Sequence, residues 1–578
     1  MVLNIVDNKN HNVKKNELVV FFNHFDNRYK NQLHLMDEFV KQQEELKIKL
    51  LNFIDNIFYK LKNQKEFKYL LSFLVFEKSP NKTQYMYLFY KTNIIIKYIK
   101  ENKISQLNLF IEDKNILSFF ISYAKQNNIK YKIKQISKTK INKRKLAMQN
   151  NLLSYGYKFY KELSKISYKI KKNSLKHKKL VVSYYPNYYL KDKNFYSKYF
   201  MELSEKLNQE YDWLFLYVGD IRKLPKENEI LSNYNLNYNF LDSFISYKDL
   251  FDVFVKHQKL FRQFKKIDLK DLFVFEDIDY FDIMIDDWKI SLSANLIDLL
   301  IFETKFNNFF KNYNYEEVLY LMEYHPWEQV LNKVIHKKNI FSKGISHSII
   351  RPNLLNYFYP KNLHNNMDVA DIVGANSEFA KKVFLDNGFK ENQVFEIEAQ
   401  RFLYLKNTIN SNKKTNNLLI STSIIFQETK EFLEVFSMAY EKGLFNKIYI
   451  KPHPYLEVKN IIKQIPNFPN HKILKTSMKE AFELVDVVYV TNGSSVLLES
   501  ILNNKQTITL FSLTSFPMPA INKHNLLHIV TSSKELNKKL KDIKNQTKNV
   551  TNKTYNLLYL DNNFKLWNKF IDYKKDIK

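Results

Sequence analysis

The stretch DVVYVTNGSSVLLES at residues 486–500 decides the predicted fold, because it passes directly from a strand through a turn into a helix. Its first apolar run predicts a buried strand, Asn492 and Gly493 predict a tight turn, and the next apolar run predicts a helix. Ser494 and Ser495 stand at the helix start, where hydroxyl and backbone N–H groups favour an anion such as a phosphate. Simple helix capping by serine is the alternative interpretation.

A second turn of this kind lies about 40 residues upstream, in YIKPHPYLE at residues 449–457. A strand ends there, and Lys451, His453 and Pro454 follow it. One βα unit separates the two turns, so both open at the carboxyl edge of one sheet, where ligands bind in open α/β folds. Glu499 lies one helical turn after the second serine and is placed to reach a ribose hydroxyl. A solvated turn whose prolines only end a strand is the competing interpretation.

The alternation of short apolar runs with amphipathic stretches extends along the chain and predicts an α/β protein with mostly parallel sheets. A C-terminal unit is expected over residues 418–535, after a polar linker at residues 406–417. A helical tail follows at residues 536–578, with an amphipathic helix over residues 552–574. The expected strands of the C-terminal unit are residues 418–422, 447–450, 487–490 and 506–510, and its expected helices are residues 427–442, 455–464 and 494–503.

An N-terminal α/β unit is expected over residues 1–405, in which residues 1–180 form a subregion whose role is open. Its expected strands are residues 69–76, 107–111, 130–136, 180–186, 213–219, 318–323, 339–346 and 371–376. Its expected helices are residues 83–100, 113–125 and 192–208, with a largely helical region at residues 240–312.

Composition excludes several classes of protein. The chain has no cysteine, which excludes a disulfide scaffold, a thiolate zinc site and a cysteine nucleophile. No apolar run approaches the roughly 20 residues that span a bilayer, and the N-terminus lacks the apolar core of a signal peptide. A cytoplasmic protein is therefore expected.

The net charge of +30 is unevenly distributed, because residues 132–179 hold 16 Lys and Arg against one acid, Glu162. Such a basic helical stretch favours an anionic membrane surface or an anionic glycan as partner. No nucleic-acid partner is expected, because the chain has no recognised nucleic-acid-binding signature. A long solvated helix is the alternative.

The paired turns resemble the nucleotide-binding arrangement of bacterial glycosyltransferases such as sialyl-, polysialyl-, Kdo and CDP-glycerol transferases. In those families the two turns hold the cytidine nucleotide of the donor. The resemblance implies a GT-B-like fold, in which two Rossmann-like domains face a cleft, with a C-terminal helix. It also implies that the nucleotide sugar is bound by Lys451, His453, Pro454, Asn492, Gly493, Ser494, Ser495 and Glu499.

A second resemblance covers residues 320–405. The order of its segments is similar to that of the bacterial surface carbohydrate biosynthesis proteins, a glycosyltransferase-like family. One departure is Phe402, which stands where that family has tyrosine. The matching segments are YLMEYHPWEQVLNKVI at residues 320–335, FSKGISHSIIRPNLLNYF at 341–358, VGANSEFAKKVFLDNGF at 373–389 and FEIEAQRFLYL at 395–405.

Carried over by position, this resemblance implies that Glu323 and His347 end adjacent strands and face the cleft. Glu323 is the first choice and His347 the second for the base that activates an acceptor hydroxyl. Arg351 would contact a phosphate or the acceptor. The alternatives are a glutamate stabilised by the helix that begins near Pro326, a core histidine and a surface salt bridge. His325 is interpreted as a helix initiator without a further role.

These observations predict a metal-independent glycosyltransferase that needs no cofactor. The expected donor is a CMP-activated ulosonic or nonulosonic acid, and a UDP-hexose is not excluded. The expected acceptor is an anionic or lipid-linked bacterial surface glycan, such as capsule, O-antigen or lipooligosaccharide, reached in peripheral contact with the inner membrane. The alternatives are a CDP-glycerol-type polyol-phosphate transferase and a non-enzymatic nucleic-acid- or glycan-binding protein. The sugar, linkage, acceptor, processivity and oligomeric state are not specified by the sequence.

Overall fold

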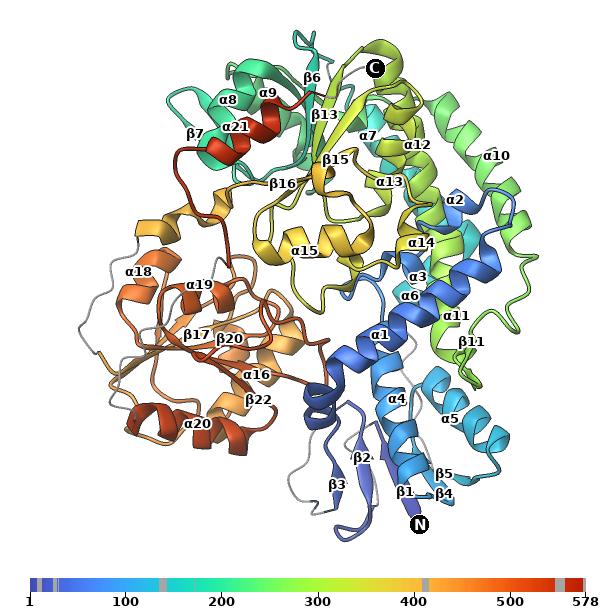
Figure 1. Cartoon of the computed structure of the whole chain (residues 1–578), viewed down its shortest axis with the longest axis vertical. Coiled ribbons are helices and arrows are strands. Elements are labelled where there is room, and N and C mark those ends of the chain that lie inside the picture. Colours follow the sequence, from blue (N-terminus) through green and yellow to red (C-terminus); the bar gives the residue numbers. More distant parts are fainter. Residues whose placement is uncertain are drawn as a thin grey trace.

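The computed structural model describes residues 1–7, 13–23, 29, 31–134, 143–170, 172–407, 415–545 and 557–574. Its main feature is three parallel sheets, which we name the N-terminal, middle and C-terminal sheets. Figure 1 shows them as three lobes around a common centre, with the middle sheet above the other two. Two small antiparallel hairpins accompany the sheets: β7 (Tyr188–Lys191) with β8 (Asn194–Ser197) follows the first strand of the middle sheet, and β11 (Val274–Phe275) with β12 (Ile278–Asp279) lies against helices of the N-terminal part.

The C-terminal sheet has the strand order β19-β18-β17-β20-β21-β22, with all pairs parallel. Counted along the chain this is the order 3-2-1-4-5-6 of a Rossmann fold. The strands are β17 (Asn417–Ser421), β18 (Lys447–Lys451), β19 (Lys472–Ile473), β20 (Val487–Thr491), β21 (Gln506–Leu510) and β22 (Leu527–Val530). The helices are α16 (Phe426–Ala439), α17 (Lys459–Ile462), α18 (Met478–Glu483), α19 (Val496–Leu502) and α20 (Ser533–Asn545).

The middle sheet repeats this order with one more strand, β10-β9-β6-β13-β14-β15-β16. Its strands are β6 (Lys179–Tyr185), β9 (Tyr211–Tyr217), β10 (Tyr238–Phe240), β13 (Glu317–Leu321), β14 (Phe341–Ile345), β15 (Ile372–Ala375) and β16 (Val394–Glu396). Its helices are α8 (Ser204–Glu210), α9 (Leu224–Ser232), α10 (Tyr247–Phe264), α11 (Phe281–Ile290), α12 (Leu296–Asn312), α13 (Pro326–His336), α14 (Lys361–His364) and α15 (Glu378–Asn387).

The N-terminal sheet has the order β3-β2-β1-β4-β5, again parallel and again beginning 3-2-1-4-5. Its strands are β1 (Val2–Val6), β2 (Val19–Phe21), β3 (Gln32–Leu33), β4 (Gln106–Phe110) and β5 (Lys130–Ile133). Helices α1 (Leu35–Leu61), α2 (Phe67–Leu70), α3 (Leu74–Glu77), α4 (Tyr85–Glu101) and α5 (Lys114–Gln126) belong to this part, and α6 (Lys143–Gln149) and α7 (Asn151–Ser167) lead to the middle sheet.

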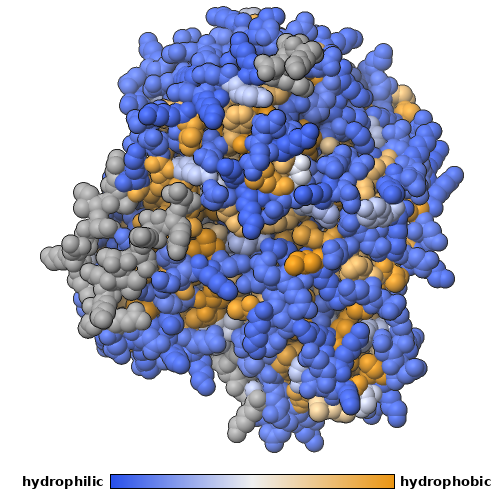
Figure 2. All heavy atoms as spheres, viewed as in Figure 1, coloured by the Kyte–Doolittle hydropathy of each residue, from blue (hydrophilic) through white to orange (hydrophobic). Residues whose placement is uncertain are grey.

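The largest hydrophobic cluster joins the N-terminal and middle sheets and reaches the C-terminal part, since it contains Leu3 of β1, Val318 of β13 and Phe511 from the loop after β21. The strands of the C-terminal sheet have buried clusters of their own. Figure 2 shows apolar side chains reaching the surface near the centre of the face drawn there, where the three lobes meet. Asn353 crosses the same junction, since its buried amide donates to Gln43 Oε1 of α1 at 3.2 Å and to the Pro517 carbonyl at 3.1 Å.

The chain end returns from the C-terminal sheet to the middle sheet as α21 (Lys565–Asp572). Glu398 accepts hydrogen bonds from the backbone N–H groups of Leu566 and Trp567 at the start of this helix, both at 2.9 Å. Lys343 donates to carbonyls at its end, including that of Ile571 at 2.8 Å. Both ends of α21 are therefore held by the middle sheet.

The α/β class and the doubly wound parallel sheets are confirmed. The expected strands of the C-terminal unit match β17, β18, β20 and β21 closely, because strands buried on both faces read as continuous apolar runs. The N-terminal unit expected over residues 1–405 contains two separate sheets.

Several local predictions are wrong. The expected strand at residues 69–76 is helical, within α2 and α3, because a short apolar run does not distinguish a strand from a buried helix. The expected helix at residues 192–208 contains strand β8, and that at residues 455–464 shrinks to α17. The tail helix begins at Lys565, since residues 557–564 precede it without helical structure.

Parts of several expected segments fall outside the described residues. These are residues 135–136 of the expected strand at 130–136, residues 135–142 and 171 of the basic stretch, residues 408–414 of the linker, and residues 546–556 and 575–578 of the helical tail. The linker prediction also overlaps a strand, because β17 begins at Asn417. Among the helices described, none is long and apolar enough to cross a membrane.

Candidate functional site

A central cavity of about 1040 Å³ lies where the carboxyl edges of the sheets meet. Its wall from the C-terminal sheet consists of the loops after β17, β18, β20 and β21, including residues 422–425 and 491–495. The loops after β17 and β20 flank the point where the strand order reverses, which is where ligands bind in doubly wound folds. The N-terminal sheet supplies the facing wall, mainly residues 80–91.

The turn at residues 491–495 lines this cavity. Asn492 holds the turn in place, because its Oδ1 accepts from the Met518 N–H at 2.9 Å and its amide donates to the Leu510 carbonyl at 3.3 Å. A Cβ added to Gly493 would meet only Met518 Cε, at 4.0 Å. The fold itself therefore does not require glycine at this position, and its absent side chain leaves space open to the cavity.

The two serines differ in their contacts. Ser494 and Ser495 both line the cavity. Ser495 Oγ donates to Glu499 Oε1 at 2.7 Å, and the Tyr404 hydroxyl donates to the other carboxylate oxygen. Glu499 thus already accepts two hydrogen bonds within the protein, and it is not among the residues that line the cavity. The contact with a ribose hydroxyl expected of Glu499 would have to form beside these two bonds.

Only part of the His-Pro turn reaches the cavity. His453 lines the cavity. Its Nδ1 accepts a hydrogen bond from the Tyr455 N–H in the same turn, at 3.3 Å. Burial lowers the pKa of His453. Lys451 points elsewhere, since its Nζ donates to the Thr476 carbonyl. Neither Lys451 nor Pro454 contributes to the cavity wall.

Arg351 is the strongest candidate for binding a phosphate. It follows β14 and lines the cavity from the side of the middle sheet. Its Nε is buried and makes no hydrogen bond or ion pair with the residues that the structure describes. Burial lowers the pKa of the guanidinium from its ordinary value. The residue as a whole is half-buried and its buried Nε lacks a partner, which suits a guanidinium that binds an anionic ligand from the cavity.

Near the cavity wall that contains Arg351, four ionisable side chains form a linked chain of groups: His347, Glu323, His325 and Glu77. Glu323 Oε2 is 3.0 Å from His325 Nε2, and its Oε1 is 3.5 Å from His347 Nε2. The other nitrogen of His325 is 3.2 Å from Glu77 Oε1 of α3, and Glu77 pairs with Lys82, which lines the cavity. The chain therefore links the end of β13 to the cavity wall. The interpretation of His325 as a mere helix initiator is wrong, because it joins two carboxylates.

Burial and pairing shift the pKa values of these side chains in opposite directions. Burial opposes ionisation of Glu323, but the charges of His347 and His325 outweigh it and lower its pKa to about 2. Burial also opposes the charged form of His325, but hydrogen bonds to Glu323 and Glu77 raise its pKa to about 9. Burial lowers the pKa of His347 to about 4. At neutral pH the chain thus holds ionised Glu323, cationic His325 and neutral His347, whose Nδ1 has no partner among the described residues.

Glu328 fixes the backbone that presents Glu323. Its carboxyl accepts from the N–H of Glu323 at 3.0 Å and from that of Tyr324 at 2.9 Å. Tyr324 has a left-handed backbone with φ of 58°, so this sharp turn depends on such bonds. The glutamate three residues after His325 therefore has a structural task in the turn.

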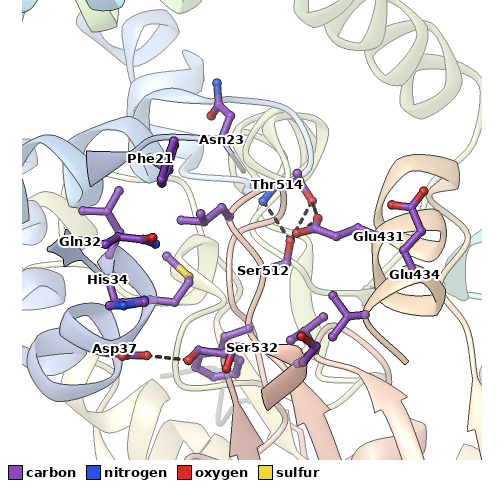
Figure 3. A pocket seen from close by; sticks show the side chains of 18 of the residues that line it. Phe21, Asn23, Gln32, His34, Asp37, Glu431, Glu434, Ser512, Thr514 and Ser532 are labelled. Carbon is purple, nitrogen blue, oxygen red and sulfur yellow. Dashed lines mark hydrogen bonds between the residues drawn. The ribbon is translucent and has the colours of Figure 1, made fainter. Parts of the chain in front are cut away.

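A second, smaller cavity of about 380 Å³ adjoins the central one and shares Asn23, Gln427, Leu513 and Thr514 with it. Figure 3 shows side chains of the N-terminal sheet facing side chains of the C-terminal sheet across this cavity. Glu431 accepts a hydrogen bond from Ser512 Oγ at 2.5 Å and another from Thr514.

Lys91 ties the two sheets together next to this cavity. Its Nζ donates to the Phe22 carbonyl at 2.6 Å, to the Leu513 carbonyl at 2.7 Å and to Asn23 Oδ1 at 3.2 Å. Burial lowers the pKa of Lys91 to about 7. The contacts of Lys91 therefore hold the facing walls of the two cavities together.

Sequence reasoning missed the contribution of the N-terminal sheet. Glu77, Lys82 and Lys91 lie more than 200 residues away in the sequence from the site residues of the other two sheets. No local motif marks them. Within the described ranges, no group of three or more His, Cys, Asp or Glu side chains is placed to hold a metal ion.

Comparison with known proteins assigns no family to this chain. No family model matches it, and no curated protein matches it. Solved structures similar to it include MnaA of S. aureus with UDP, which is 11% identical with a TM-score of 0.40 and matches over 69% of this chain and 99% of that one. The UDP-GlcNAc 2-epimerase from Neisseria meningitidis bound to UDP-GlcNAc is 10% identical with a TM-score of 0.40, over 68% and 97%. The enzyme of that name from Rickettsia bellii is 12% identical with a TM-score of 0.37, over 68% and 95%. Likeness at this level assigns neither substrate nor residue roles.

Proposed function

We propose that the chain is a glycosyltransferase that binds a nucleotide-activated sugar in the central cavity. The observation that carries the proposal is Arg351, whose buried Nε has no partner among the described residues and which lines a cavity built at the strand-order reversal of a Rossmann-type sheet. A diphosphate or monophosphate group supplies the anion that this cation lacks. Ser494, Ser495 and the open space beside Gly493 provide donors and room for the same group.

Transfer in this site needs a base for the acceptor hydroxyl. The bond between the anomeric carbon and the donor phosphate breaks, and the nucleotide leaves with the electron pair. The acceptor oxygen forms the new glycosidic bond, and its proton passes to the base. Glu323 is ionised and His347 is neutral, so either is in the protonation state that accepts a proton. Arg351 would stabilise the charge that develops on the departing phosphate.

The donor that we propose carries a cytidine nucleotide, which rests on the resemblance of the paired turns to CMP-sugar and CDP-glycerol transferases. The ulosonic and nonulosonic acids are then the candidate sugars, and a bacterial surface glycan is the candidate acceptor. A uridine nucleotide is the alternative donor.

A thermal-shift panel of CMP, CDP, UDP and GDP tests nucleotide binding, because a ligand of the folded state raises apparent stability. We expect a cytidine nucleotide to raise Tm. A response to UDP alone would remove the cytidine donor and keep the transferase, whereas no response to any nucleotide would remove the transferase.

The base is tested by transfer assays with Glu323→Gln and His347→Asn, using the donor that the panel identifies. Loss of transfer with unchanged nucleotide binding is expected for the variant that removes the base. Glu378→Gln, an exposed glutamate of α15, serves as the matched control. Near-normal turnover in both site variants would exclude this chain of groups from the chemistry.

A further inference from the structure

Helix α7 leaves large apolar side chains exposed. Its fully buried residues are Ser154, Glu162 and Lys165, and its half-buried apolar residues Tyr155, Phe159, Leu163 and Ile166 pack against the core. Its outer face carries further large apolar side chains, of which Leu152 and Tyr160 are each 70% exposed. The outer face of a helix in a monomeric soluble protein is normally polar or charged. The complete set of exposed apolar side chains on this helix is Leu152, Leu153, Tyr157 and Tyr160.

The orientation of α7 is fixed by a buried network of four charges. Lys165 Nζ is 2.8 Å from Glu162 and 2.7 Å from Asp242, and Lys305 Nζ is 2.7 Å and 2.6 Å from the same two carboxylates. Rotating α7 to bury its outer apolar side chains would separate Glu162 and Lys165 from Asp242 and Lys305. The outer apolar side chains therefore stay on the surface.

The neighbouring helix α10 extends the apolar surface. The two helices are in contact, since the rings of Tyr155 and Phe254 lie 4.6 Å apart. Tyr247, Phe251 and Val255 recur at intervals of four residues along α10, and all three are exposed. In Figure 2, orange side chains interrupt the hydrophilic surface on the right-hand side, where Figure 1 draws α10. We name the exposed apolar residues the α7–α10 face; they are Leu152, Leu153, Tyr157, Tyr160, Tyr247, Phe251 and Val255.

The charges around this face are mainly positive. In the sequence, residues 143–179 contain 12 Lys and Arg and one acid, Glu162; of these, Lys165 pairs with Glu162 in the buried network and Lys158 pairs with Asp298. Around the face, Lys161, Lys248 and Lys259 are exposed, and Asp252 is an exposed acid on α10. The face thus combines tyrosines and aliphatic side chains with a basic surround.

We propose that the α7–α10 face docks the protein on an anionic lipid bilayer. Tyrosine is the residue type that lies at the boundary between headgroups and acyl chains, and aliphatic side chains enter the acyl region. Lysines beside them bind anionic headgroups, each adding to the affinity and each losing its effect as salt rises. This inference does not depend on the proposed enzymatic function, because it rests on a different part of the surface.

The test uses the full chain and vesicles of two compositions, phosphatidylcholine alone and an equal mixture of phosphatidylcholine and phosphatidylglycerol. Co-sedimentation should show binding to the anionic vesicles at least about tenfold tighter than to the neutral ones, and high salt should weaken it. The triple variant with Leu153→Ser, Tyr157→Ser and Tyr160→Ser should bind at least about tenfold more weakly. The double variant Ile48→Ser with Val218→Ser removes exposed apolar side chains elsewhere and should bind as the wild type does.

The absence of native cysteine permits a direct measurement of insertion. An environment-sensitive dye on Leu153→Cys should shift its emission to the blue with anionic vesicles, whereas the same dye on Val218→Cys should not. The proposal is overturned by wild-type protein that does not bind anionic vesicles, by equal binding of the triple variant, or by equal binding to neutral vesicles. A wild-type dimer that the triple variant converts to a monomer, without vesicle binding, would make this face a protein interface instead.

Discussion

Arg351 is the residue on which the proposed nucleotide binding most depends. Its buried Nε has no partner among the described residues, so the folded protein bears the cost of desolvating this group. We expect Arg351→Gln to keep or raise the Tm of the ligand-free protein. The same variant should lose most of the stabilisation by nucleotide. A fall of several degrees in the ligand-free Tm would instead indicate a structural role for the guanidinium.

Gly493 gives a second prediction at the level of the single residue. Its backbone is not left-handed and a Cβ at this position has space, so Gly493→Ala should fold with a change in stability below about 1 kcal/mol. Gly493→Val should still fold but should weaken nucleotide binding at least about tenfold, because the larger side chain enters the cavity. Titration calorimetry with the stabilising nucleotide measures this. Unchanged affinity in Gly493→Val would place the phosphate elsewhere.

His325 makes stability depend on pH in a defined direction. Its pKa is raised to about 9 in the folded protein, so its contribution is fully present below the ordinary value of about 6.5 and is lost as pH rises through 9. The difference in unfolding free energy between wild type and His325→Asn should therefore be largest near pH 6, at about 3 kcal/mol. Urea titrations at a series of pH values measure it, and a difference that does not shrink by about pH 10 would contradict the pairing with Glu77 and Glu323.

Residue-level prediction from sequence placed together groups that follow neighbouring strands. The turn at residues 491–495, His453 and Arg351 all line the cavity, and their roles stay predictions. It failed for His325, because the partner Glu77 is 248 residues away in the chain. It also could not predict that the Lys451 side chain points away from the cavity. The direction of a lysine side chain depends on its acceptor, here the Thr476 carbonyl, which the motif does not contain.

At the level of elements, α21 shows how the chain end stabilises a distant sheet. Trp567 is almost fully buried against the middle sheet, and its indole N–H donates to the Glu398 carbonyl at 2.8 Å. Trp567→Ala should cost about 3 to 5 kcal/mol of unfolding free energy, as for other large buried aromatic residues. Urea unfolding measures the loss, and an exposed member of the same helix, Lys565→Ala, is the matched control. Equal stability of the two variants would mean that α21 is not docked in solution.

Element prediction worked best for the C-terminal sheet, where strands and helices alternate regularly and each strand is buried. It missed β1, β2 and β3 of the N-terminal sheet, which are five, three and two residues long. Helix α7 is a different case. It has apolar side chains on its inner and outer faces, and only the structure shows which are exposed, because the charges that orient the helix come from α7, from α12 and from the turn that contains Asp242.

At the level of the whole molecule, three parallel sheets meet around the central cavity. The N-terminal sheet closes the cavity from the side opposite to the C-terminal sheet, and Lys91 holds the two together. Lys91→Met should leave two backbone carbonyls without a donor. We expect faster hydrogen exchange in segments around residues 22 and 513, with unchanged exchange in the middle sheet. Uniformly unchanged exchange would show that Lys91 is not needed for this closure.

The central claim is that a nucleotide binds in the cavity between the three sheets, against Arg351. Titration calorimetry of the stabilising nucleotide into wild type, Arg351→Gln and Lys451→Gln tests it most directly, because both substitutions remove a cation but only Arg351 lines the cavity. We predict that Arg351→Gln weakens binding at least about tenfold, which corresponds to about 1.4 kcal/mol, and that Lys451→Gln stays within about twofold of wild type. Undiminished binding in Arg351→Gln, or a loss confined to Lys451→Gln, would contradict the claim.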